Sequence, residues 1–131
     1  MMDVYVADTH SLIWFISEDD RLSKRAWRVF EQAEESKVEV LIPTIVLAEI
    51  TYIAKKKKVK IAIEEVLKCI EQESSFAIVP FDLPVFQTLL KLPEELEIHD
   101  RIIAATARYY HAQLITKDKT LRESDVIKTI W

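Results

Sequence analysis

The stretch that decides the fold is HDRIIAATARYYHAQLITKD, residues 99–118. Asp100 and Asp118 stand near its two ends, and apolar residues recur at helical spacing over 100–110. Residues 113–116 form a strand-like run after a polar turn. A helix of about 11 residues rises roughly 16 Å, and a strand of about 5 residues covers a similar length. The chain therefore goes down the helix and back up the strand, so both aspartates are expected at the same edge of the fold.

Outward from this stretch, strand-like and helical segments alternate. Strands are predicted at 3–7, 38–42, 76–81, 113–116 and 126–130. Helices are predicted at 10–17, from Ser23 onward, from Pro43-Thr44 to the lysine tract at 55–58, and at 61–73, 84–90 and 100–110. Ser23 and Thr44 are expected to cap their helices. Strands separated by helices indicate an α/β fold with a mainly parallel, doubly wound sheet covered by helices on both faces.

The position of the ligand site follows from this topology. If strands one to three build toward one edge and the chain then returns past strand one, strands one and four become neighbours. Ligands of such folds bind at this switch point, beyond the carboxyl ends of the strands. Asp8 ends the first strand and Asp118 ends the fourth.

Composition limits the function. The 131 residues carry a formal net charge of −4, which argues against nucleic-acid binding through bulk positive charge. No glycine occurs, so the phosphate-binding loop and the dinucleotide fingerprint are excluded. No apolar run is long enough to span a bilayer and no signal-peptide pattern opens the chain. One domain over 1–131 in the cytoplasm is expected.

Glu49 is the acid that is hardest to explain structurally. It lies in IVLAEITYIA, with Ile45, Val46, Tyr52 and Ile53 as its helical neighbours, and a glutamate in an apolar stripe is rarely buried without a partner. The other acids have ordinary alternatives. Asp8 could cap a helix, and Asp118 could be a turn residue. Asp100 could lie in the first turn of a helix, where the helix dipole stabilises negative charge.

Four carboxylates gathered at one edge would repel one another and take up protons. Divalent ions would remove that cost, and ligation by oxygen alone suits Mg²⁺ or Mn²⁺ rather than zinc. Such ions neutralise a phosphodiester and lower the pKa of bound water. Metal-dependent phosphodiester hydrolysis is therefore the expected chemistry.

Four segments in order, VYVADTH (4–10), IVLAEI (45–50), HDRIIAATA (99–107) and LITKD (114–118), resemble the PIN-domain ribonucleases, in particular the VapC-type toxins of toxin–antitoxin pairs. The resemblance covers nearly the whole chain. It implies a PIN domain over 1–131 with sheet order 3-2-1-4-5, and Mg²⁺- or Mn²⁺-dependent cleavage of RNA by activated water. It also implies homodimerisation and inhibition by a small VapB-type antitoxin.

The resemblance also implies the site residues. The metal-binding and catalytic acids would be Asp8, Glu49, Asp100 and Asp118, supported by the hydroxyls of Thr9 and Thr116, all present here. The departure is the missing glycine in the turn before strand four, where this chain has His111-Ala112.

Three alternatives remain open. A receiver domain would need a phospho-accepting aspartate after a middle strand, whereas strand two ends in Ile42-Pro43-Thr44. A phosphatase with an aspartyl nucleophile would need a second acid two residues after Asp8, where His10 stands. A PIN-like module that binds RNA or protein without cutting is the third.

Other features allow two interpretations each. Residues 12–16 (LIWFI) are apolar all around a helix, which favours coverage by another chain over burial within the monomer. Lys60 and the tract 55–58 could bind RNA phosphates, but a solvated helix end is the simpler interpretation. Arg101 and Lys117 flank site acids and are better candidates for phosphate contact. Catalytic histidines are not expected.

Overall fold

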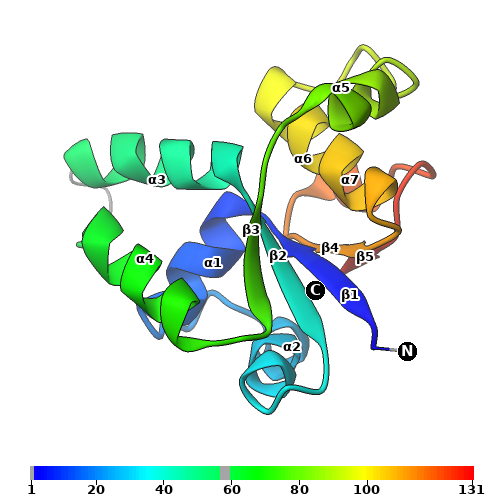
Figure 1. Cartoon of the computed structure of the whole chain (residues 1–131). Coiled ribbons are helices and arrows are strands. Elements are labelled where there is room, and N and C mark those ends of the chain that lie inside the picture. Colours follow the sequence, from blue (N-terminus) through cyan, green and yellow to red (C-terminus); the bar gives the residue numbers. More distant parts are fainter. Residues whose placement is uncertain (1, 57–59) are drawn as a thin grey trace.

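The computed structural model describes residues 2–56 and 60–131. These residues form five strands, β1 (Val4–Ala7), β2 (Glu39–Pro43), β3 (Phe76–Val79), β4 (Gln113–Ile115) and β5 (Thr129–Ile130). They also form seven helices, α1 (Thr9–Ile16), α2 (Lys24–Glu34), α3 (Thr44–Lys55), α4 (Ile63–Gln72), α5 (Leu83–Leu89), α6 (Ile98–Tyr109) and α7 (Lys119–Arg122). Figure 1 shows the helices arranged around the central sheet.

The sheet has the order β3-β2-β1-β4-β5, and all of its pairings are parallel. The predicted order 3-2-1-4-5 is therefore confirmed. β1 lies between β2 and β4, with Val6 opposite Leu41 on one side and Leu114 on the other. Because β1 and β4 are neighbours, the switch point lies where β1 ends at Ala7 and β4 ends at Ile115.

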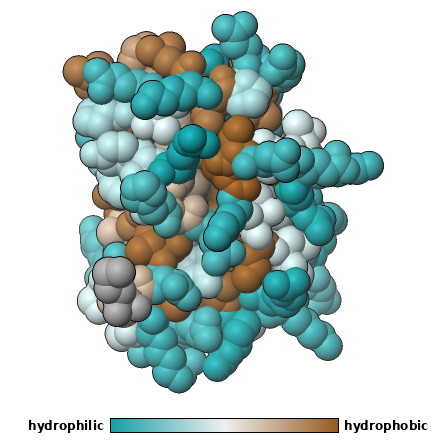
Figure 2. All heavy atoms as spheres, turned by 90° about the vertical axis from the view of Figure 1, so that its right-hand side faces the viewer, coloured by the Kyte–Doolittle hydropathy of each residue, from teal (hydrophilic) through white to brown (hydrophobic). Residues whose placement is uncertain are grey.

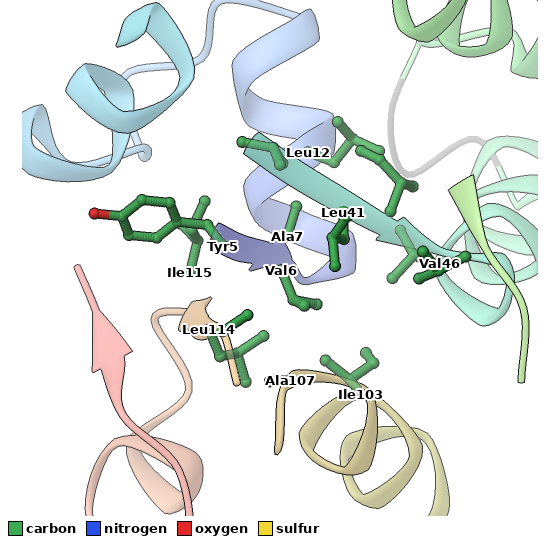
Figure 3. Close-up of a cluster of buried hydrophobic side chains, with 14 of the residues drawn as sticks. Tyr5, Val6, Ala7, Leu12, Leu41, Val46, Ile103, Ala107, Leu114 and Ile115 are labelled. Carbon is green, nitrogen blue, oxygen red and sulfur yellow. The ribbon is translucent and has the colours of Figure 1, made fainter. Parts of the chain in front are cut away.

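The core forms on both faces of β1. Figure 3 shows α1 on one side of the strand and α6 on the other, with Leu12 and Ile103 pointing toward it from these helices. Val6, Leu12 and Leu114 are completely buried. The apolar sequence of β1, VYVA, is thus explained by the cover on both faces of this strand.

Side-chain caps fix where most helices begin. Asp8, Ser23, Asp82, Glu97 and Asp118 each precede a helix and accept a hydrogen bond from a backbone N–H of its first turn. The cap predicted at Ser23 is therefore confirmed. The cap predicted at Thr44 is wrong, because Pro43 occupies the N-cap position of α3 without a side-chain bond and Thr44 is already helical.

Two further expectations need correction. The fifth strand was expected over 126–130, but only Thr129–Ile130 pairs with β4, because β4 itself is three residues long. The apolar run 12–16 was expected to be covered by another chain. Instead Leu12, Ile13, Trp14 and Phe15 are at most 8% exposed within this chain, because α1 packs against α2 and α3 and covers one face of β1 (Figure 3).

Exposed apolar side chains occur elsewhere. Leu83 and Leu90 are 65% and 62% exposed, and Phe86 is 42% exposed, all on or directly after α5. Figure 2 shows hydrophobic patches among mostly hydrophilic side chains on the side that faces right in Figure 1. Within the described ranges, no helix is long and apolar enough to cross a membrane. The tract 55–58 can be followed only to Lys56, since Lys57 and Lys58 lie outside the described residues.

Candidate active site

The four acids singled out in the sequence line one cavity of about 470 Å³ at the carboxyl edge of the sheet. Asp8, Glu49, Asp100 and Asp118 come from four different segments, namely the end of β1, the middle of α3, the first turn of α6 and the start of α7. The remaining lining residues are Thr9, His10, Ser11, Trp14, Ile103 and Lys117. The predicted convergence of the four carboxylates is therefore observed.

Asp8 is held by the end of β1 and the start of α1. One carboxylate oxygen, Oδ1, accepts a hydrogen bond of 2.9 Å from the backbone N–H of Ser11. The backbone N–H of Asp8 donates to the carbonyl of Ile115, and so does the Ser11 hydroxyl. Burial raises the pKa of Asp8, and hydrogen bonds from Ser11 and Thr116 oppose that rise. The expected capping role and a place in the site are both present.

Asp118 has the same arrangement at the end of β4. Its Oδ1 accepts from the backbone N–H of Leu121 at 3.0 Å, and its own N–H donates to the Thr116 hydroxyl at 3.0 Å. Thr116 is completely buried, so its side chain is a fixed point for the turn that carries Asp118. The supporting position predicted for Thr116 is consistent with this contact.

Glu49 lies on α3, where its neighbours Val46 and Ile50 are buried. Its Oε1 accepts a hydrogen bond of 2.8 Å from the hydroxyl of Thr9, which is only 4% exposed. Thr9 thus connects α1 to α3 and orients the glutamate. This contact explains a half-buried carboxylate in an apolar helix without any cation.

Asp100 is an acid whose charge is disfavoured by its surroundings. Its backbone N–H is capped by Glu97, but its carboxylate accepts no hydrogen bond from the described residues. Burial, followed by the charges of Asp118, Glu97, Asp8 and Glu49, raises the pKa of Asp100 to about 6. The side chain therefore lies where negative charge is concentrated and poorly solvated.

The donor set fits a hard divalent cation. All four acids offer oxygen, and the hydrogen bonds at Glu49 and Asp118 engage one carboxylate oxygen each, which leaves the second oxygen available. Asp8 accepts from the backbone N–H of Ser11 through Oδ1. Among residues 2–56 and 60–131, no three His, Cys, Asp or Glu side chains already lie close enough to hold a metal. Small side-chain movements would have to bring the free oxygens together.

One wall of the cavity is aromatic and basic. The Trp14 ring lies 5.5 Å from the His10 ring and 5.9 Å from the Trp131 ring, between centroids. The Lys117 ammonium lies 5.8 Å from the Trp14 ring centroid, so Lys117 is at the site as expected. Arg101 is not, because its guanidinium donates to the carbonyl of Leu92.

Reasoning from the sequence missed three lining residues, Ser11, Trp14 and Ile103. Trp14 was assigned only to the apolar run of α1, although its i,i+4 spacing from His10 places both on one helix face. Ser11 was overlooked, although it follows Asp8 by three residues, the spacing at which a cap contacts the backbone. His99 lies outside the cavity lining and pairs with Glu97 at 2.9 Å.

Comparison with known proteins agrees with this geometry. The family model described as the PIN domain matches residues 5–126. The chain belongs to the PIN-domain family. A relative from Mycobacterium tuberculosis, Ribonuclease VapC22, is 30% identical over 124 residues, which are 92% of each protein.

Solved structures share the fold. VapBC2 from Rickettsia felis, solved with a DNA fragment from its promoter, has a TM-score of 0.73 at 20% identity and covers 97% of both chains. VapBC from Salmonella typhimurium, also solved with DNA, has a TM-score of 0.70 at 19% identity over 99% of this chain and 98% of that chain. A toxin–antitoxin complex from Klebsiella pneumoniae has a TM-score of 0.64 at 24% identity, over 97% and 96%.

Proposed function

We propose that this protein is a VapC-type endoribonuclease that hydrolyses RNA phosphodiester bonds with Mg²⁺ or Mn²⁺ and acts as the toxin of a toxin–antitoxin pair. The observation that carries the proposal is the meeting of four carboxylates from four segments in one cavity of a PIN fold. The similarity to Ribonuclease VapC22 supports RNA as the substrate.

Asp8, Glu49, Asp100 and Asp118 would hold the metal through their free oxygens. When bound, the ion supplies positive charge for the phosphodiester and a lowered pKa for water. The chain's own residues orient these carboxylates, through the Ser11 N–H for Asp8, the Thr9 hydroxyl for Glu49 and the Leu121 N–H for Asp118. Thr9 and Thr116 are therefore positioning residues.

Lys117 gives this acidic cavity its positive charge, since it is the lining residue with an ammonium group. Its side chain extends over the Trp14 ring at the rim, where it can bind a phosphate of the incoming RNA. The neighbouring His10 is exposed and makes a tilted contact with the same ring. It is not needed as a base, because a bound metal would lower the pKa of water without one.

The proposed partners are a VapB-type antitoxin and a second copy of the chain, in the cytoplasm. Solved relatives of this fold include toxin–antitoxin complexes. The exposed apolar side chains of α5, Leu83, Phe86 and Leu90, are surface that a partner would cover. They replace α1 as the expected contact region.

The test is cleavage of RNA by the purified protein. Cleavage should require Mg²⁺ or Mn²⁺ and stop with a chelator. A lost metal-holding carboxylate removes several kcal/mol of transition-state stabilisation. We therefore expect Asp8→Asn, Glu49→Gln and Asp100→Asn each to lower kcat/KM by about 100-fold or more.

The matched controls are Glu95→Gln and Asp125→Asn, which remove exposed carboxylates outside the cavity and should leave the rate unchanged. Circular dichroism checks that each variant is folded. Unchanged cleavage by Asp100→Asn would contradict the assignment. Metal-independent RNA binding without cleavage by the wild type would favour the non-catalytic PIN-like module instead.

A further inference from the structure

Two adjoining hollows lie beside the candidate active site. One, of about 340 Å³, is lined by residues of α2 together with Tyr5 and Ile130, and the other, of about 560 Å³, by residues of α7 and β5 together with Trp131. Arg25 and Ile130 line both, so the two hollows adjoin at these residues. We call their cationic side chains the basic band, which consists of Lys24, Arg25, Arg28, Lys119 and Arg122.

The charge of this band is opposite to that of the protein. The chain has a formal net charge of −4, yet the two hollows are lined by these five cations and one carboxylate side chain, Glu123. Arg28 and Lys119 form ion pairs with glutamates. Lys24, Arg25 and Arg122 form no ion pair with any described residue, so their charges are available to a ligand.

The band begins at the rim of the catalytic cavity. Lys119 directly follows Asp118 in the sequence. Trp131, which lines one hollow, packs edge-on against Trp14, which lines the cavity. A chain of phosphates that leaves the cavity past Trp14 would meet Trp131, which lines the same hollow as Arg122 and Arg25.

We propose that the basic band binds the backbone of single-stranded RNA on one side of the phosphate that is cleaved; this inference rests on the proposed function. Grooves that hold single strands combine cations along the backbone with aromatic rings, and Trp131 provides the ring here. The planar guanidinium of arginine can donate two hydrogen bonds to the oxygens of one phosphate. The four acids of the site repel RNA, so adjacent positive charge is needed to keep the substrate in place.

The experiment compares a long and a minimal substrate. Arg25→Glu/Arg122→Glu is measured on an RNA of about 20 nucleotides and on bis(p-nitrophenyl) phosphate, which fills only the cavity. We expect kcat/KM for the RNA to fall about 10- to 100-fold, mainly through KM, with unchanged hydrolysis of the small diester. The slope of log(kcat/KM) against log[salt] should become shallower by about 0.7 per lost phosphate contact.

The matched control is Lys68→Glu/Lys91→Glu, which makes the same charge change at two exposed lysines outside both hollows. A loss equal to that of the control would overturn the proposal. The proposal would also be overturned if the Arg25→Glu/Arg122→Glu variant cleaved RNA normally but was no longer inhibited by an acidic protein partner, because the band would then bind protein. Arg25→Gln/Arg122→Gln repeats the test without introducing negative charge.

The nuclease function and the band can fail separately. If the wild type cleaves neither substrate, the nuclease function is wrong. In that case RNA binding tests the basic band alone. Fluorescence anisotropy measures the affinity of the Asp100→Asn variant for RNA, with and without the substitutions at Arg25 and Arg122. Binding that weakens about 10-fold or more supports it, and equal binding overturns it.

Discussion

Asp100 is a residue whose ionisation destabilises the fold. Burial and four neighbouring carboxylates raise its pKa to about 6, from an ordinary value of 3.8. The folded state therefore binds a proton at Asp100 more tightly than the unfolded state does. The contribution of Asp100 to the free energy of unfolding is greatest below pH 3.8 and is lost as the pH rises through about 6. Without metal, ionised Asp100 destabilises the fold at neutral pH.

Asp100→Asn should accordingly stabilise the metal-free protein. The full shift corresponds to about 3 kcal/mol, and partial exposure reduces this to about 1–2 kcal/mol at about pH 7.5. The gain should disappear below about pH 4, where the wild-type carboxyl is protonated. Urea unfolding in chelator at the two pH values measures it. Asp125→Asn, at an exposed acid outside the site, is the control, and destabilisation by Asp100→Asn at the higher pH would contradict the electrostatic explanation.

At the residue scale, the four site acids could be predicted from the sequence, but the contacts of the residues around them could not. A carboxylate after a strand end or within an apolar helix is visible in the sequence, as with Asp8 and Glu49. The Thr9–Glu49 bond is not, since it joins residues 40 positions apart. Arg101 neighbours Asp100 in the chain, yet it turns to Leu92, because consecutive helical residues face different directions.

Three helices end in a motif that usually requires glycine, although the chain has none. Glu18, Ser36 and His111 follow the ends of α1, α2 and α6 with positive φ values of 53°, 59° and 53°. At each of these positions, the residue and its successor donate their backbone N–H groups back to the helix, as when Ala112 donates to the carbonyl of Ala107 at 2.8 Å. This is the Schellman closure, formed here by residues with a Cβ.

Glycine at these positions should therefore be stabilising. A left-handed residue with a Cβ costs roughly 1–2 kcal/mol, and glycine loses about 0.5–1 kcal/mol through the greater freedom of the unfolded chain. His111→Gly should raise the free energy of unfolding by about 0.5–1 kcal/mol, as measured in urea. His111→Ala keeps the Cβ and serves as the matched variant. An equal gain from alanine would show that the imidazole, rather than the backbone, is the source.

The helices and strands differ in how accurately the sequence predicted their bounds. Helix α6 and strand β4 follow from the stretch 99–118, because one shows helical spacing and the other a short apolar run. Helix α3 was placed correctly, but its capping residue was not, because proline and threonine both suit a helix start. β5 was expected to be longer, because the length of its partner β4 decides how much of 126–130 can pair.

At the scale of the whole molecule, the order β3-β2-β1-β4-β5 is what brings residues 8, 49, 100 and 118 together. Alternating strands and helices with right-handed crossovers leave only a few topologies, and the resemblance to PIN-domain ribonucleases implies this order, so the convergence could be predicted. The burial of α1 could not, because it depends on how α2 and α3 pack around it. The basic band depends likewise on the placement of α2 beside β5.

Binding of Mg²⁺ should stabilise the entire fold, because the repulsion among the four acids is removed only in the folded state. A ligand at about 100 times its Kd stabilises by about 2.7 kcal/mol, which corresponds to a Tm increase of roughly 8–12 °C for a domain of this size. Differential scanning calorimetry with a Mg²⁺ titration measures the increase. Glu49→Gln should show a much smaller one, and an equal increase in both proteins would place the ion elsewhere.

The edge-to-face contact of Trp14 with Trp131 at the mouth of the cavity gives the protein an optical signal of its own. Indole emission responds to nearby charge and to exclusion of water. Occupancy of the cavity can therefore be followed by steady-state fluorescence of the unlabelled chain. Trp27, which packs against Phe15 away from this mouth, contributes a constant background, and Trp27→Phe would leave the reporting pair to be observed alone.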